Sequence, residues 1–302
     1  MADNHPNLLD KGRVATAWRQ TKVRVLQAKR LMDWARRADQ WPTAQLSEHP
    51  LKYEIYRRVQ PILCGDEGAQ PEFEEGKLAN LQLAARAFDG VVLTPEHPLS
   101  FWRTLGKVTE SQGYRYGMEL RGGCIVPALG GGLCLLSNAL FAMAAHTGCT
   151  IIERHGHTME AIPPSLHELW GLDATVFWPY VDLRFAPRGE QVHLQVQVIA
   201  QSLHLIMTAD QPLPFEVELQ AIDDQIEIRP EGRFRSNKLM RKFTLPQESR
   251  AIEEALLCEN RKILLHQEQQ RRNCLTCGEV SCHSRVSLPP TQRTSLDKLL
   301  AK

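Results

Sequence analysis

The sequence predicts an α+β fold in which a cysteine-bearing helix packs on a mainly antiparallel sheet, with helical N-terminal and C-terminal extensions. An apolar run from Cys134 to His146 follows three glycines and is typical of a buried helix. Period-two alternation then appears in residues 192–198 and 215–228, which predicts half-buried strands. Their short connections favour antiparallel pairing, and one helix followed by a run of strands is typical of an α+β domain.

The first predicted element is a helix between residues 10 and 39. Its apolar residues recur at spacings of three, four and seven, which places on one stripe Val14, Trp18, Val25, Ala28, Met32 and Ala35. The same segment carries nine Lys and Arg against three Asp. A basic amphipathic helix can make peripheral contact with an anionic membrane surface. The alternative, which we favour, is a helix docked on its own domain with a solvated outer face.

Residues 61–76 are rich in turn-forming and acidic residues and indicate a loop. A short helix, Lys77 to Phe88, and a strand at Val91–Leu93 are expected next. A second long helix is expected from Gln247 to Arg272, because its acidic start and basic end match the helix dipole. The predicted organisation is a basic helical extension (1–60), a loop and short helix (61–84), an α+β domain (85–245), and a C-terminal helix with a cysteine-rich tail (246–302).

The composition excludes several functional classes. Lys and Arg number 36 against 35 Asp and Glu, and this balance argues against a nucleic-acid binder. We find no signal peptide, no apolar run long enough to span a membrane, and no indication of a nucleotide cofactor. The eight cysteines therefore indicate reduced thiols or metal ligands, and we expect a cytoplasmic protein.

The most informative functional feature is Cys134, which follows Gly130, Gly131 and Gly132. Successive glycines allow unusual backbone conformations and close approach of other groups. The apolar run after them predicts that Cys134 lies near a helix N-terminus. Unpaired N–H groups and the positive end of the helix dipole favour a thiolate there. This pattern predicts an activated thiol, with the glycines lining a substrate-binding site.

Two histidines and an aspartate follow the cysteine along the chain. If residues 153–158 form a strand, His155 and His157 project from the same face. We assign Cys134 as the nucleophile, His157 as its base and His155 as the second candidate. Asp173, expected on a later strand, would orient the imidazole as the third member of a nucleophile–base–acid triad.

Neighbouring groups extend this predicted site. The glycine turn and the helix N-terminal amides are expected to form an oxyanion hole. Arg154 is a candidate for binding a substrate carboxylate, although a structural ion pair is the commoner use of such a residue. Two alternatives stay open for the cysteine: Cys134 packs in the core, or it binds Zn²⁺ together with His155 and His157.

The C-terminal region contains a compact set of soft metal ligands, namely Cys274, Cys277, Cys282 and His283. Its C-x-x-C-G segment is typical of zinc knuckles, in which the glycine allows the tight turn under the metal. We therefore predict a zinc site in the tail. A redox dithiol, an iron–sulfur site and unliganded thiols are the alternatives.

Several motifs occur together and in order: Phe101–Gly106, Gly113–Tyr114, Gly130–Cys134, Glu153–His157, Gly171–Thr175 and Asp182–Phe185. In these motifs the chain resembles the VanW family over roughly residues 90 to 210. The resemblance implies a cell-envelope or glycopeptide-resistance context. Family members usually carry a glutamine after the cysteine, where this chain has Leu135. The order Cys, His, Asp also resembles transglutaminase-like and papain-like thiol enzymes, as an analogy of arrangement.

We therefore expect a VanW-like protein linked to glycopeptide (vancomycin) resistance or the cell envelope. The hypothesis is a Cys–His–Asp thiol enzyme, amidase-like or transpeptidase-like, that transfers the acyl group of a peptide or cell-wall-precursor amide. The alternative is a non-catalytic binding or accessory module with a structural metal-bound tail. The sequence identifies no protein partner.

Overall fold

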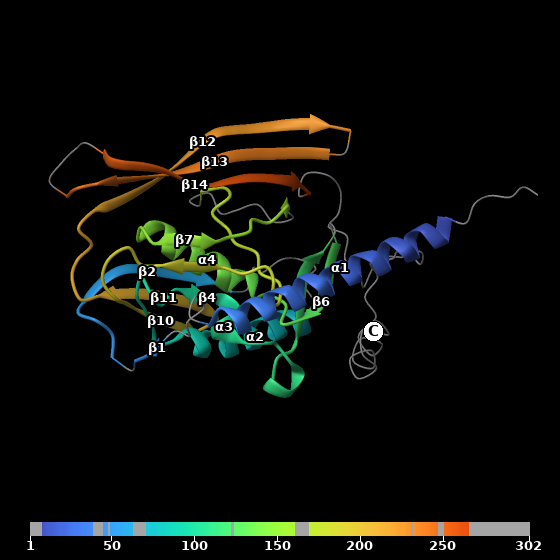
Figure 1. Ribbon diagram of the computed structural model, residues 1–302, viewed down its shortest axis with the longest axis horizontal. Coiled ribbons are helices and arrows are strands. Elements are labelled where there is room, and N and C mark those ends of the chain that lie inside the picture. Colours follow the sequence, from blue (N-terminus) through green and yellow to red (C-terminus); the bar gives the residue numbers. More distant parts are fainter. Residues whose placement is uncertain are drawn as a thin grey trace, which may run out of the picture.

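The computed structural model describes residues 8–38, 45–47, 49–62, 71–121, 124–160, 169–230, 232–246 and 251–265. Its helices and mainly antiparallel sheets confirm the predicted α+β class (Figure 1). The elements are α1 (Leu8–Arg36), β1 (Gln45–Leu46), β2 (Tyr53–Pro61), α2 (Pro71–Phe88), β3 (Val91–Leu93), β4 (Leu99–Ser100), α3 (Phe101–Leu105), the 3-10 helix η2 (Glu110–Gln112), β5 (Tyr116–Arg121), β6 (Cys124–Leu129), α4 (Cys134–His146), β7 (Thr150–Glu153), β8 (Met159–Glu160), β9 (Arg184–Ala186), β10 (Val192–Ile199), β11 (Ser202–Ala209), β12 (Glu216–Arg229), β13 (Gly232–Thr244) and β14 (Ala251–Leu264).

The central sheet has the strand order β1-β3-β10-β11-β2, and all its neighbours pair antiparallel. The predicted alternation in β10 is confirmed, because Val192, Leu194 and Val196 are all buried. Their partners on β11 include Met207 and Leu205, which are also buried. Helix α2 packs on β10, and α4 packs on β11 and β2. These contacts form one apolar core around the two helices.

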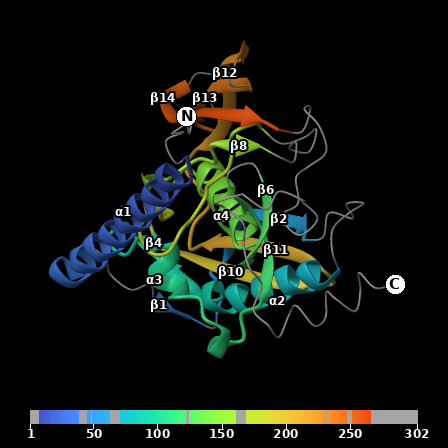
Figure 2. The ribbon, with the colours of Figure 1, turned by 90° about the vertical axis from the view of Figure 1, so that its right-hand side faces the viewer.

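Helix α4 begins at Cys134, as predicted, and lies between the central sheet and the C-terminal sheet (Figures 1 and 2). The glycine turn before it packs directly on the β5–β6 hairpin. A Cβ atom on Gly131 would lie 2.3 Å from the carbonyl carbon of Gly117. Gly130 and Gly132 have φ angles of 75° and 99°, which L side chains rarely adopt. The glycines therefore allow the hairpin to contact the turn that holds Cys134.

The C-terminal sheet has the order β12-β13-β14-β8. The predicted helix from Gln247 to Arg272 is wrong, since Ala251–Leu264 forms strand β14. This strand pairs with β13 along its length, from Thr244 opposite Ala251 to Phe234 opposite Ile263. Pairing and burial override the helical charge pattern of this segment, because strand formation depends on tertiary context. The two alternating segments in residues 215–228 likewise belong to the single strand β12.

Helix α1 confirms the predicted N-terminal helix, but its predicted apolar stripe faces solvent. Trp18, Val25 and Met32 are 72%, 60% and 47% exposed. The helix contacts the domain through its opposite face, where Trp34 packs edge-on against Trp178 with ring centroids 5.7 Å apart. Among the described residues, no helix is long and apolar enough to cross a membrane. Peripheral membrane contact through α1 stays a prediction.

Two further segments differ from the expected organisation. Strand β2, from the segment assigned to the N-terminal extension, pairs with β11 in the central sheet. Residues 71–76, expected in a loop, form the first turns of α2. Within this helix Gly76 has no Cβ, which allows the Tyr116 carbonyl to approach closely. Helix α1 itself runs from Leu8 to Arg36, close to the predicted bounds of 10 and 39.

Candidate active site

The thiol of Cys134 lies at the first residue of α4 and contacts three groups from later in the chain. Interactions with the His157 side chain and with the backbone N–H of Val176 lower the pKa of this thiol. The Thr175 hydroxyl lies 3.8 Å from the sulfur. Asn138 and Ser137 of the same helix bind the backbone of Ala174, and these bonds keep the segment that contains Thr175 beside the thiol. The site therefore joins a helix N-terminus to an extended chain segment.

His157 connects the thiol to Asp173. Its Nδ1 lies 2.5 Å from Asp173 Oδ2, and its backbone N–H donates to the same oxygen at 2.9 Å. Because Nδ1 faces the carboxylate, Nε2 is the ring nitrogen left for Cys134. The imidazole side chain remains 27% exposed. The structure thus brings together the cysteine, one histidine and the aspartate that the sequence singled out.

The second histidine does not join them. Residues 154–157 follow β7 without strand pairing, so the expected strand over 153–158 is wrong. The ladder between β7 and β9 is already irregular between Ile151 and Glu153, and β7 ends there. Period-two projection consequently fails, and His155 Nε2 lies 3.1 Å from Glu153 Oε1, with its side chain 46% exposed. Asp173 likewise lies in an extended connection and not on a strand.

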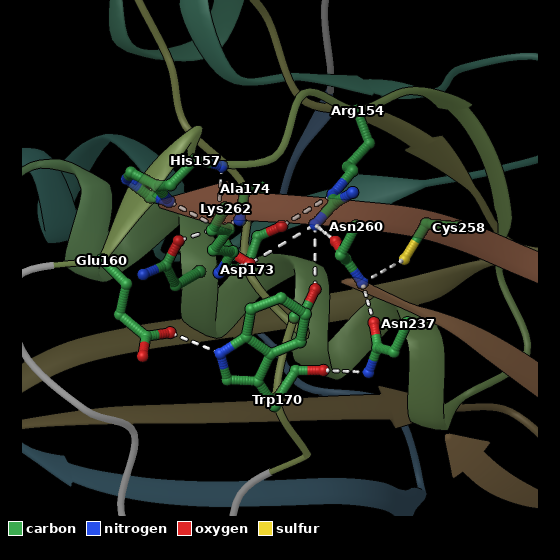
Figure 3. A network of polar contacts seen from close by, with 12 residues as sticks. Arg154, His157, Glu160, Trp170, Asp173, Ala174, Asn237, Cys258, Asn260 and Lys262 are labelled. Carbon is green, nitrogen blue, oxygen red and sulfur yellow. Dashed lines mark hydrogen bonds and ion pairs between the residues drawn. The ribbon is translucent and has the colours of Figure 1, made fainter. Parts of the chain in front are cut away.

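Arg154 lies beside Asp173, and its guanidinium donates hydrogen bonds to oxygen atoms of the protein. Its Nε bonds the Asp173 carbonyl at 2.7 Å, and its Nη2 bonds the Gly171 carbonyl at 2.9 Å. The same Nη2 lies 2.8 Å from Asn260 Oδ1 and 3.4 Å from Asp173 Oδ1 (Figure 3). The Arg154 side chain is only 7% exposed and forms a structural ion pair with Asp173, which is the alternative given for it in the sequence analysis. A role in binding a substrate carboxylate is not supported by these contacts.

The charges of this group favour an ionised pair. Burial opposes charge on Asp173, but bonding to His157 and the positive charges of Lys262 and Arg154 hold the pKa of that carboxyl far below its usual range. Burial also opposes charge on His157, yet its bonds to Asp173 and Cys134 raise the pKa of the imidazole to about 9. Burial raises the pKa of the Cys134 thiol, but the hydrogen bond and charge of His157 outweigh it and lower that pKa overall. These shifts favour a thiolate beside an imidazolium.

The glycine turn offers few backbone donors. The N–H groups of Gly130 and Gly131 donate to backbone carbonyls, and so do those of Leu133, Leu135, Leu136 and Ser137. This bonding narrows the expected oxyanion hole to the N–H groups of Gly132 and Cys134, for which the structure gives no such acceptor among the described residues. The helix amides as a group are therefore not the donors.

Sequence reasoning missed three side chains of the site. Thr175 stands two residues after Asp173, so period-two projection was a usable signal for it. Lys262 and Asn260 come from β14, a segment predicted to be helical, and no local pattern connects them to Asp173 and Arg154. Their contribution depends on the pairing of β14 in the C-terminal sheet.

The predicted metal sites have different outcomes. His155 points to Glu153, so it does not share a ligand set with Cys134 and His157. In the ranges that the structure describes, no three His, Cys, Asp or Glu residues are grouped to hold a metal ion. The predicted zinc ligands lie outside these ranges and stay a prediction: Cys274, Cys277, Cys282 and His283. Cys258 lies on β14, where its sulfur accepts from Asn260 Nδ2 at 3.8 Å.

Part of the chain is similar to known proteins. The family model described as VanW like protein matches residues 76–208. The Vancomycin B-type resistance protein VanW of Enterococcus faecalis is 32% identical over 140 residues, which are 46% of this chain and 51% of that protein. The uncharacterized protein YoaR of Bacillus subtilis is 34% identical over 114 residues, which are 37% of this chain and 36% of that protein.

The matched region contains Cys134, His157 and Asp173 and ends before β12, β13 and β14 of the C-terminal sheet. The chain spans about half the length of the Enterococcus relative and about a third of the Bacillus relative. No solved structure matches the chain significantly.

Proposed function

We propose that this chain, which is similar to the VanW like protein family over residues 76–208, is a thiol-dependent acyl-transfer enzyme acting on a peptide or cell-wall-precursor amide. The Enterococcus relative is named as a vancomycin B-type resistance protein. That name supports an envelope-related amide as the substrate class. The catalytic assignment itself rests on the local geometry.

One observation carries the proposal: a single histidine is hydrogen-bonded to Asp173 and interacts with Cys134, which lies at a helix N-terminus. The thiolate attacks the carbonyl carbon of the amide, and a C–S bond forms as the carbonyl oxygen becomes negative. The N–H groups of Gly132 and Cys134 are the proposed donors to this oxyanion. Protonated His157 gives its proton to the amide nitrogen, the C–N bond breaks, and an amine leaves.

The acyl group then remains on Cys134 as a thioester. Neutral His157 takes a proton from water or from an acceptor amine, whose lone pair attacks the thioester carbonyl. Collapse breaks the C–S bond and regenerates the thiolate and the imidazolium. Water gives hydrolysis, and an amine gives transpeptidation. Asp173 stays ionised throughout and keeps Nδ1 protonated, so that Nε2 exchanges the proton.

The first experiment alkylates the purified full chain with iodoacetamide over about pH 5 to 9 and quantifies each cysteine peptide by mass spectrometry. We expect Cys134 to be alkylated rapidly at pH values well below the pKa of an ordinary thiol. Cys149 is the internal reference for an unreactive thiol, because burial raises the pKa of its thiol to about 11. His157→Gln is expected to slow labelling of Cys134 at neutral pH about tenfold or more.

His155→Gln is the matched control, since His155 lies two residues away and bonds Glu153. It should leave the labelling of Cys134 unchanged. Incubation with a panel of peptide and cell-wall-precursor amides should then add an acyl group to the intact mass of the wild type, and not of Cys134→Ala. Labelling of Cys134 at the rate of an unperturbed thiol would overturn the enzyme proposal and favour a binding module.

A further inference from the structure

The C-terminal sheet reaches the candidate active site through Lys262 of β14. Its Nζ donates to Asp173 Oδ1 at 2.6 Å, and the two side chains are 7% and 12% exposed. Lysine is almost never this buried without a partner, since removing an ammonium from water is costly. Lys262 also lies outside the region that matches the family model. This ion pair therefore connects an element beyond the VanW-like domain to the proposed triad.

The two oxygens of Asp173 have different partners. Oδ1 accepts from Lys262 and lies 3.4 Å from Arg154 Nη2. Oδ2 accepts from the backbone N–H of His157 and faces its ring nitrogen. Two cations on one oxygen neutralise the carboxylate and restrict its rotation. The other oxygen is consequently kept for the histidine.

Other side chains of β13 and β14 support this arrangement (Figure 3). Asn260 accepts from Arg154 through Oδ1, and its Nδ2 donates to Asn237 Oδ1. Asn237 in turn donates to the Trp170 carbonyl. The Trp170 ring centroid lies 5.1 Å from Lys262 Nζ, which is a cation–π distance. The sheet thus holds Lys262 and Arg154, the two cations that contact Asp173 Oδ1.

We propose, on the basis of the proposed function, that Lys262 is a positioning residue of the thiol site: it fixes Asp173 through Oδ1, so that Oδ2 holds His157 against Cys134. The C-terminal sheet then completes the site that the VanW-like domain begins. A purely structural ion pair predicts only a loss of stability when Lys262 is replaced. A positioning role also predicts a change in the reactivity of the thiol.

The expected change follows from the charges around the carboxylate. Lys262, Arg154 and His157 are the cationic groups facing Asp173. The charges of Arg154, Asp173 and Lys262 also affect the pKa of a second thiol, that of Cys258. Removing the ammonium leaves the negative charge of Asp173 less compensated. A more negative surrounding favours the protonated imidazole and disfavours the thiolate, so the pKa values of both groups rise.

The test compares Lys262→Met, Lys262→Arg and Lys238→Met in the full chain. Lys238 is the matched control, because it lies on the same sheet and pairs with Asp223 at the surface, at 2.9 Å. Lys262→Met should move the pH dependence of Cys134 alkylation to higher pH by about one unit. At neutral pH this shift corresponds to labelling that is about tenfold slower. Lys262→Arg should label within about twofold of the wild type, because it keeps the charge. Lys238→Met should match the wild type.

A folded Lys262→Met variant with the wild-type profile would overturn the positioning role. Near-UV circular dichroism verifies the fold, and if this variant unfolds, Lys262→Ala with and without added methylammonium gives the same comparison. If the wild-type Cys134 labels as an ordinary thiol, the proposed function fails. Even then, the pKa of His157 measured by NMR tests Lys262, since an unchanged value in Lys262→Met would contradict the inference.

Discussion

The Ser137 hydroxyl donates to the carbonyl of Ala174 at 2.6 Å, so the first turn of α4 is bonded to the residue that follows Asp173. Asn138 completes this contact, because its Oδ1 accepts the N–H of Ala174 at 2.9 Å. Both polar groups of one peptide segment are therefore held by the helix that begins at Cys134. This bonding sets the spacing between the thiol and the segment that carries Asp173 and Thr175.

Ser137→Ala is expected to destabilise the protein by about 1–3 kcal/mol, because it leaves a buried carbonyl without its donor. It should also slow the labelling of Cys134, since the Ala174 segment loses one of its two bonds to α4. Thr147→Val is the control, because the Thr147 hydroxyl bonds the Met143 carbonyl in a buried position at the other end of the same helix. It should cost a similar free energy of unfolding in urea and leave labelling unchanged. Equal labelling in both variants would contradict this role of Ser137.

Gly131→Ala should be more damaging than its size suggests. The added methyl group would lie 2.3 Å from the carbonyl carbon of Gly117, and a backbone atom cannot rotate away as a side chain can. We expect a loss of about 3 kcal/mol or more in the free energy of unfolding. Gly189→Ala is the matched control, because a Cβ there meets nothing within 4 Å. Equal urea midpoints for the two variants would show that the β5–β6 hairpin can move away from the glycine turn at little cost in free energy.

Arg30 of α1 and Glu153 of β7 form a bidentate ion pair, with N–O distances of 2.8 and 2.7 Å. Burial opposes charge on Glu153, but bonding to His155 and Arg30 lowers the pKa of its carboxyl to about 2. A lowered pKa contributes stability above the ordinary value of 4.5, and this contribution is lost as the pH falls toward 2.

Arg30→Met is therefore expected to destabilise the protein by about 1–3 kcal/mol at neutral pH. The difference from the wild type should shrink between pH 4.5 and about 2, when measured by urea unfolding across that range. Arg57→Met is the control, since the Arg57–Glu54 pair is exposed and should contribute little. A difference that stays constant down to about pH 2 would exclude Glu153 as the partner that matters.

The central residues of the site were predictable because their signals are local. Cys134 follows a glycine turn and opens an apolar helix, and both features are readable in the sequence. The choice between the two histidines was not readable. It depends on where β7 stops pairing with β9, which turns His157 toward Asp173 and His155 toward Glu153.

The contribution of β14 was unpredictable for a different reason. Its sequence has the charge order of a helix, and only pairing with β13 makes it a strand. In a strand, Asn260, Lys262 and Leu264 alternate toward the buried face, and Lys262 then meets Asp173. Sequence periodicity also misassigned the packed face of α1, because polar bonds such as Gln27 to the Trp178 carbonyl hold that helix in place. Long-range polar contacts leave no periodic pattern.

The paired ionisation of Cys134 and His157 predicts an unusual dependence of stability on pH. The folded-state pKa of His157 is raised from 6.5 to about 9, so its contribution is complete below pH 6.5 and is lost as the pH rises toward 9. The pKa of Cys134 is lowered from 9.0, so its contribution grows as the pH rises toward 9.0. The raised pKa of His157 and the lowered pKa of Cys134 give slopes of opposite sign, so the thiol offsets the loss of stability from the histidine. In urea unfolding, the wild type should therefore lose less stability than Cys134→Ser between pH 6.5 and about 9, because only the histidine slope remains in the variant. The double variant Cys134→Ser/His157→Gln should be flat, and parallel curves for the wild type and Cys134→Ser would rule out the thiolate–imidazolium pair.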